Sequence, residues 1–136
     1  MPKKVFVSYD HSEDVHYKEL LRAWDANTDF DFEFDLRSPN VAIDSNDASV
    51  IQANLTKKMK ESEYILVIIG KKSYTSKWQK WEVGRAKKDD VKLKFAAVKI
   101  ESNSQNPEGL PNSTAIANGF TLQGIVNVLN NANNYY

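Results

Sequence analysis

One continuous apolar run, Tyr64–Ile69, constrains the fold of this chain more than any other segment. It is bounded by charged residues on one side and by Gly70 on the other, and it predicts a β-strand. Because no polar residue alternates with the apolar ones, this strand must be buried on both faces, as the strands of parallel sheets are. The chain must therefore place other elements on each side of a sheet.

Three further segments have strand-like patterns. Val5–Tyr9 and Phe95–Ile100 are short runs rich in β-branched and aromatic residues, which strands favour. In residues 30–35, phenylalanines alternate with acidic residues, so this segment predicts an edge strand with one apolar and one acidic face. The pattern near Ile116 indicates a short strand only weakly.

Four segments have apolar residues at helical spacing, each beginning at a serine or threonine that can cap it. They extend from Ser12 to about Ala26, from Ser49 to about Ser62, from Ser76 to about Asp90, and from Thr121 to about Leu129. Gln52 and Gln79 lie three residues after Ser49 and Ser76, which is the spacing of a capping box. We expect the last helix to fray into the Asn-rich tail, residues 130–134.

Strands that alternate with helices predict βαβ crossovers and a mostly parallel sheet. We expect one α/β domain over the 136 residues, with its core at about 3–131: a flavodoxin-like three-layer sandwich around a four- or five-stranded sheet. Ligands of such folds bind at the carboxyl ends of the strands. Ser8–His11, the polar loop 37–48 and Gly70–Trp78 all follow expected strands at that edge.

The composition excludes several classes of function. Basic and acidic residues number 18 each, so no overall positive charge favours nucleic acid, and the absence of cysteine excludes disulfides and thiolate metal sites. We expect no metal, because the two histidines lack the spacing of a metal site and the loop around Asp44 lacks the EF-hand glycine and glutamate. No apolar stretch approaches the roughly 18 residues of a membrane span. We therefore expect a soluble, cytoplasmic protein without membrane or nucleic-acid partners.

Glycine-rich phosphate loops and the GxSxG elbow are also absent, which disfavours a tightly bound dinucleotide cofactor and a serine hydrolase of that type. The candidate with most chemical interest is Glu82, four residues after Trp78 and on the same face of the predicted helix. A partly desolvated carboxylate there can bind a sugar hydroxyl or stabilise a developing cation. The alternative is an exposed glutamate favoured by the helix dipole, with Trp78 and Trp81 as core residues.

The strands Val5–Asp10 and Tyr64–Ile69, followed by Ser76-x-Trp78-x-x-x-Glu82, resemble a Toll/interleukin-1 receptor (TIR) domain. The resemblance is to the compact bacterial TIR-like proteins of Thoeris-type antiphage defence. It implies an NAD⁺ glycohydrolase or cyclase that cleaves the nicotinamide–ribose bond and yields ADP-ribose or a cyclic isomer as an immune signal. NAD⁺ would be the substrate, and no cofactor would be needed.

By this resemblance Glu82 is the catalytic residue. Five further residues are expected at the substrate: Ser8, Tyr9, Asp10, Asp44 and Trp78. The family also implies self-association that completes the active site and a downstream effector that senses the product. Two alternatives remain open, a non-catalytic TIR-type interaction module and a nucleoside deoxyribosyltransferase-like enzyme, which also uses a glutamate on an α/β sheet.

Overall fold

The computed structural model describes residues 3–9, 32–35, 48–70, 73–88, 90–100, 105–107, 109–111 and 114–134. The helix expected from Ser12 to Ala26 lies outside these residues, as do Asp10 and Asp44.

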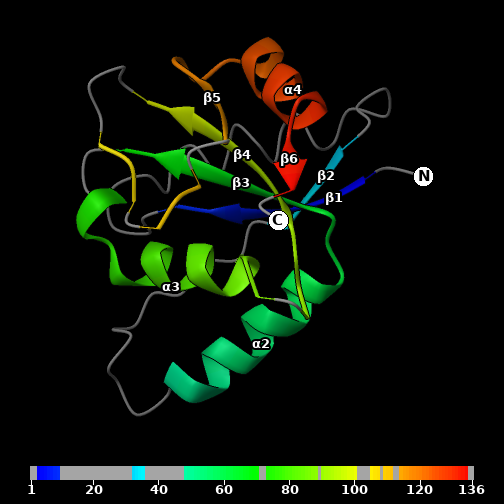
Figure 1. Ribbon diagram of the computed structural model, residues 1–136, viewed down its shortest axis with the longest axis vertical. Coiled ribbons are helices and arrows are strands. Elements are labelled where there is room, and N and C mark those ends of the chain that lie inside the picture. The colour runs from blue at the N-terminus through cyan, green and yellow to red at the C-terminus, as the bar shows by residue number, and fades with distance from the viewer. Residues whose placement is uncertain are drawn as a thin grey trace.

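A central parallel sheet organises the fold, with the strand order β2-β1-β3-β4-β5 (Figure 1). Its parallel strands are β1 (Lys3–Ser8), β2 (Phe32–Asp35), β3 (Tyr64–Ile69), β4 (Lys94–Lys99) and β5 (Ala115–Ala117). This is the flavodoxin-like order, in which the direction of strand addition reverses between β1 and β3. β2 forms an edge of the sheet, as its alternating pattern predicts, and the weakly indicated strand near Ile116 is β5.

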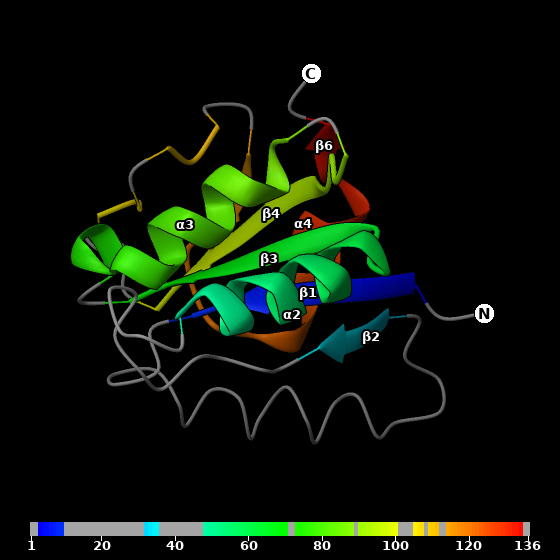
Figure 2. The ribbon, with the colours of Figure 1, turned by 90° about the horizontal axis from the view of Figure 1, so that it is seen from below.

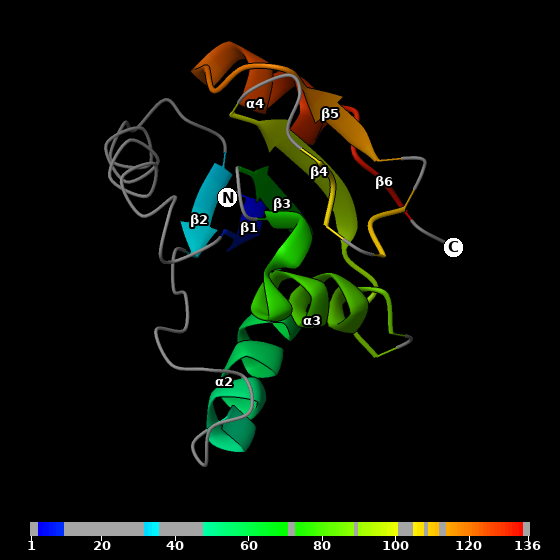
Figure 3. The same cartoon turned by 90° about the vertical axis from the view of Figure 1, so that its left-hand side faces the viewer.

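Helices cover both faces of this sheet and produce the predicted three layers. The helices α2 (Ala48–Lys60) and α3 (Lys77–Ala86) lie across one face, seen from below in Figure 2. The helix α4 (Leu122–Asn130) lies on the other face (Figure 3). A short 3₁₀ turn, η1 (Ser73–Thr75), leads from β3 into α3.

The core consists of two apolar clusters separated by the sheet. All six residues of β3 are buried, which confirms the prediction from its apolar run. Alternate residues serve the two faces: Leu66 and Ile68 pack with Ile125 and Leu129 of α4. Their neighbours Ile65, Val67 and Ile69 belong to the cluster of the α2 and α3 side, together with Leu55, Met59, Val83 and Ala86. This double coverage explains why the run contains no polar residue.

Some element ends differ from the sequence prediction. α2 begins at Ala48, so Ser49 lies inside the helix and is not its N-cap. α3 ends at Ala86, earlier than the expected Asp90, because the backbone N–H of Lys87 bonds to Gly84 O and tightens the last turn. Thr121 does cap α4, where its side chain accepts a hydrogen bond from Gly124 N.

The Asn-rich tail does not simply fray, because Asn133–Asn134 form β6, antiparallel to β4. β6 pairs with Lys94 and Phe95, whereas β5 pairs with residues 96–98 of the same strand. The tail therefore occupies the part of the β4 edge that β5 leaves open. Asparagine has a low strand propensity, so local sequence does not indicate this pairing. Within the described segments, none of the helices combines the length and apolar character that crossing a membrane requires.

Candidate active site

Glu82 is buried against the sheet, with only 1% of its surface exposed. Gln79, Val83 and Ala86 are buried with it on the inner face of α3. The alternative of an exposed glutamate favoured by the helix dipole is therefore wrong. Burial of a carboxyl group is uncommon in proteins, and it needs a partner or a change in protonation.

The partner of Glu82 is Ser8, the last residue of β1. Ser8 Oγ donates a hydrogen bond of 2.8 Å to Glu82 Oε1, and Ser8 is itself fully buried. The contact joins residues 74 positions apart, from the carboxyl end of β1 to the second turn of α3. It lies beside the reversal of strand order between β1 and β3, where doubly wound sheets bind their ligands.

The environment of Glu82 favours its protonated form. Burial raises the pKa of this carboxyl group from 4.5 to about 8, and the hydrogen bond from Ser8 opposes that rise. Desolvation disfavours the charged form, whereas a donor to the carboxylate favours it, and here desolvation is the larger effect. A strongly perturbed carboxyl group at a ligand-binding edge is a typical sign of a functional site.

Trp78 lies at the border of the apolar cluster on the α2 and α3 side, where it is half-buried. Its ring meets that of Trp81 edge to face, with 5.8 Å between the ring centroids. This packing agrees with the core role considered for both tryptophans. It also keeps one large aromatic ring one turn before Glu82 on α3, as the spacing predicts.

Tyr9 lies on the other face of the sheet from Glu82. Its side chain is 2% exposed and packs with the cluster under α4, alongside Val5 and Val7. Because side chains of a strand alternate between faces, Ser8 turns toward α3 and Tyr9 turns away from it. Of the expected site residues, the structure thus joins Ser8 to Glu82 and does not bring Tyr9 to them.

Gln79 was not singled out as a site residue from the sequence, yet it lies at the centre of this region. Its Nε2 donates to Ile68 O at 2.9 Å and to Ser8 O at 3.3 Å. Only half of the predicted capping box forms: Ser76 Oγ accepts a bond from Gln79 N, while the glutamine side chain points to the sheet. Its position three residues before Glu82, on the same helix face, was the available signal.

The outer face of α3 has a different character. An open groove of about 860 Å³ runs along it, lined by Trp81 and by basic residues that include Lys77, Lys80 and Arg85. Neither Ser8 nor Glu82 lines this groove. Elsewhere in the described residues no group of three or more His, Asp or Glu side chains is placed to hold a metal ion.

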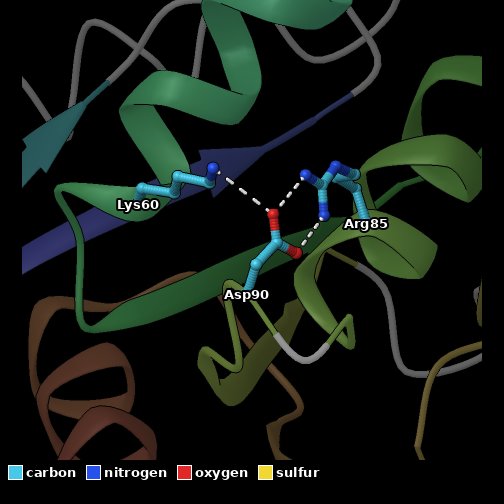
Figure 4. A network of polar contacts seen from close by, with 3 residues as sticks. All are labelled: Lys60, Arg85 and Asp90. Atoms are coloured by element: carbon cyan, nitrogen blue, oxygen red, sulfur yellow. Dashed lines mark hydrogen bonds and ion pairs between the residues drawn. The ribbon is translucent and has the colours of Figure 1, made fainter.

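An ion-pair network joins this face of α3 to the end of α2 (Figure 4). Arg85 binds both carboxylate oxygens of Asp90, at 2.7 and 2.8 Å, and Lys60 Nζ lies 3.4 Å from Asp90 Oδ2. The guanidinium group of Arg85 holds the pKa of Asp90 well below its usual range.

Because this network is exposed to solvent, we expect Asp90→Asn to have a small effect. The melting temperature should fall slightly at low salt, and the difference should shrink at 1 M NaCl, since salt screens exposed ion pairs. Thermal unfolding at both salt concentrations checks this. A large, salt-independent loss of stability would contradict it.

The sequence also matches a known protein family. The family described as "Thoeris protein ThsB, TIR-like domain" matches residues 6–105, from the second half of β1 through β4, and therefore includes Ser8, Trp78, Gln79 and Glu82. A search of curated proteins finds no match to the chain. The match covers well over half of the 136 residues, and α3 with Trp78 and Glu82 lies within it. The chain therefore belongs to the family of Thoeris ThsB TIR-like domains.

Proposed function

We propose that this protein is an NAD⁺ glycohydrolase or cyclase in which Glu82 is the catalytic residue. The observation that carries the proposal is the buried Ser8–Glu82 pair at the ligand-binding edge of the sheet. An interaction module has no need of a buried carboxyl group, because burial of the charged form destabilises the fold. Membership in a defence-related TIR family supports the same activity.

In the proposed reaction, the bond between the ribose anomeric carbon and the nicotinamide nitrogen breaks. Its electron pair leaves with nicotinamide, which departs as a neutral molecule, and positive charge develops on the ribose as in other glycosyl transfers. The Glu82 carboxylate stabilises that charge and binds ribose hydroxyls. Water then attacks the anomeric carbon to give ADP-ribose and a proton, or a nucleophilic group of the substrate itself attacks it to give a cyclic isomer and a proton.

The neighbours of Glu82 have supporting roles. The hydrogen bond from Ser8 favours the carboxylate form and fixes its orientation. Trp78 supplies an aromatic wall that excludes water from the sugar. We further propose that Asp10 and Asp44, outside the described residues, contact the substrate, that no cofactor is required, and that a downstream effector senses the product as an antiphage signal.

Access to Glu82 requires a rearrangement, since its side chain is 1% exposed. We propose that self-association completes the site and accompanies this opening. Specific activity should therefore rise with protein concentration. Nicotinamide release measured over a wide range of protein concentrations checks this.

The main experiment incubates concentrated protein with NAD⁺ and, separately, with deoxynucleosides, and identifies the products by mass spectrometry. Nicotinamide with ADP-ribose or a cyclic isomer supports the proposal. Base release from deoxynucleosides alone would instead identify a deoxyribosyltransferase-like enzyme. If neither nicotinamide nor a free base is released at high protein concentration, the non-catalytic interaction module is the remaining alternative.

The activity should increase with pH around a midpoint of about pH 8, because the pKa of Glu82 is raised to about 8 and only its carboxylate can stabilise a cation. Below that midpoint, kcat/KM should rise about tenfold per pH unit and then level off. The midpoint for kcat should lie lower, because the positively charged nicotinamide ring of the bound substrate favours the carboxylate. A profile that is flat or falls between pH 6 and 9 would contradict this role.

A further inference from the structure

Gln79 connects the ends of the two strands that flank the site. It is fully buried, and its Nε2 donates to the main-chain carbonyls of Ile68 in β3 and Ser8 in β1. Because an amide nitrogen only donates and an amide oxygen only accepts, these two carbonyls determine which way the amide faces. The side chain is therefore held in one orientation between β1 and β3.

Ser8 is thereby held twice by the same helix. Its carbonyl accepts from Gln79, and its hydroxyl donates to Glu82 at 2.8 Å. Gln79 and Glu82 lie three residues apart, so both contacts come from adjacent turns of one helix face. A shift of the Ser8 main chain would move its hydroxyl away from Glu82 Oε1.

Stability of the fold does not explain this glutamine well. Gln79 Oε1 is buried and has no hydrogen-bond partner, which is an unfavourable state for a polar atom. Ile68 O also has a second donor, Ser73 Oγ at 3.1 Å. An apolar side chain of the same size would have no unpaired acceptor. The bond to the Ser8 carbonyl is therefore the contact that only Gln79 supplies.

We propose that Gln79 is a positioning residue of this site, which holds the Ser8 main chain so that the Ser8 hydroxyl meets Glu82. The inference deepens the proposed function, and its kinetic test rests on that function. Within the part of the chain that the structure describes, the pKa of Glu82 is shifted by burial and by the Ser8 hydrogen bond, with no charged group among the causes. Lys77, Lys80 and Arg85 of the same helix line the outer groove instead.

The test replaces Gln79 by methionine, which is similar in length and makes neither bond. We expect kcat to fall about 10- to 100-fold while KM stays within about twofold, as misplacement of a catalytic group predicts. The midpoint of the pH profile should move to higher pH, in the same direction as in Ser8→Ala, because Ser8 lowers the pKa of Glu82. Gln79→Leu, made in parallel, is used for the same measurements if the methionine variant does not fold.

Ser73→Ala is the matched control, because it also removes a donor from Ile68 O but does not touch the Ser8 carbonyl. We expect a lower melting temperature and an unchanged pH midpoint. The proposal is overturned if the Gln79 variants keep the wild-type midpoint, or if Ser73→Ala shifts it equally.

A readout independent of activity separates this inference from the proposed function. The Glu82 carboxyl can be titrated by ¹³C NMR, with Glu82→Gln used to assign its signal. A higher titration midpoint in Gln79→Met and Ser8→Ala than in wild type supports the positioning role even if no nicotinamide is released. An unchanged midpoint in Gln79→Met overturns it even in an active enzyme.

Discussion

Replacing Glu82 by glutamine should lower the rate of nicotinamide release by roughly 1000-fold or more, the scale expected when a preorganised charge-stabilising group is removed. The change keeps the size of the side chain, and the amide oxygen can still accept the hydrogen bond from Ser8 that Glu82 Oε1 accepts at 2.8 Å. It removes the negative charge that ionised Glu82 carries and that the proposed ribosyl cation needs, and it places an amide NH₂ where one carboxylate oxygen stood. Nicotinamide from concentrated protein, measured by chromatography with mass spectrometry, gives the rate.

The matched control is Glu63→Gln. Glu63 is an exposed glutamate just before β3, at the opposite end of that strand from the site. This variant should retain wild-type activity. A Glu82→Gln protein with undiminished activity would remove the catalytic assignment, whereas loss of activity in both variants would point to a general effect of the substitution.

The same Glu82→Gln substitution should stabilise the protein at neutral and alkaline pH. The pKa of Glu82 is 4.5 when unfolded and about 8 when folded. Between these values the unfolded state is charged while the folded state stays protonated, so the unfolded state binds fewer protons and stability falls as pH rises. At pH 8 the variant should gain roughly 4 kcal/mol over wild type, since each pKa unit corresponds to about 1.4 kcal/mol.

Urea unfolding of both proteins at several pH values measures this difference. It should be near zero below pH 4.5, grow between pH 4.5 and 8, and then level off, in line with the two pKa values. Glu63→Gln, at an exposed position, is measured in parallel as the control for the substitution itself. If Glu82→Gln is less stable than wild type at pH 8, the buried carboxyl does not destabilise the fold. The pH dependence proposed for activity then loses its basis.

Together, these two outcomes would show a residue that weakens the fold and is needed for the reaction. Such a trade-off is expected at functional sites. It distinguishes the enzyme from a scaffold, because a scaffold that carried glutamine at position 82 would be more stable and lose nothing.

Local patterns predicted most of the architecture. The unbroken apolar run of β3 required cover on both faces, and α2, α3 and α4 provide it. The alternation around Phe32 predicted the edge strand β2. The pairing of β6 was not predictable, because it depends on the edge of β4 that β5 leaves open, and this is a property of the assembled sheet.

The site was predicted in part. Helical spacing and the strand-to-helix order pointed to Glu82 and Trp78, and Ser8 was expected beside them. Tyr9 was expected there too, but the alternation along β1 directs it into the cluster under α4. The sequence indicates Gln79 only as half of a capping box, because nothing local to α3 shows that its amide reaches carbonyls in β1 and β3.

The order of strands and helices, the family and the position of the key glutamate all follow from the amino-acid sequence, because they depend on residue spacing along the chain. The burial of Glu82, its raised pKa and its bond to Ser8 were decided by tertiary structure. The physical reason is that desolvation and hydrogen bonding depend on which atoms surround the carboxyl group. Ser8, which donates the hydrogen bond to Glu82, lies in a strand 74 residues earlier in the chain.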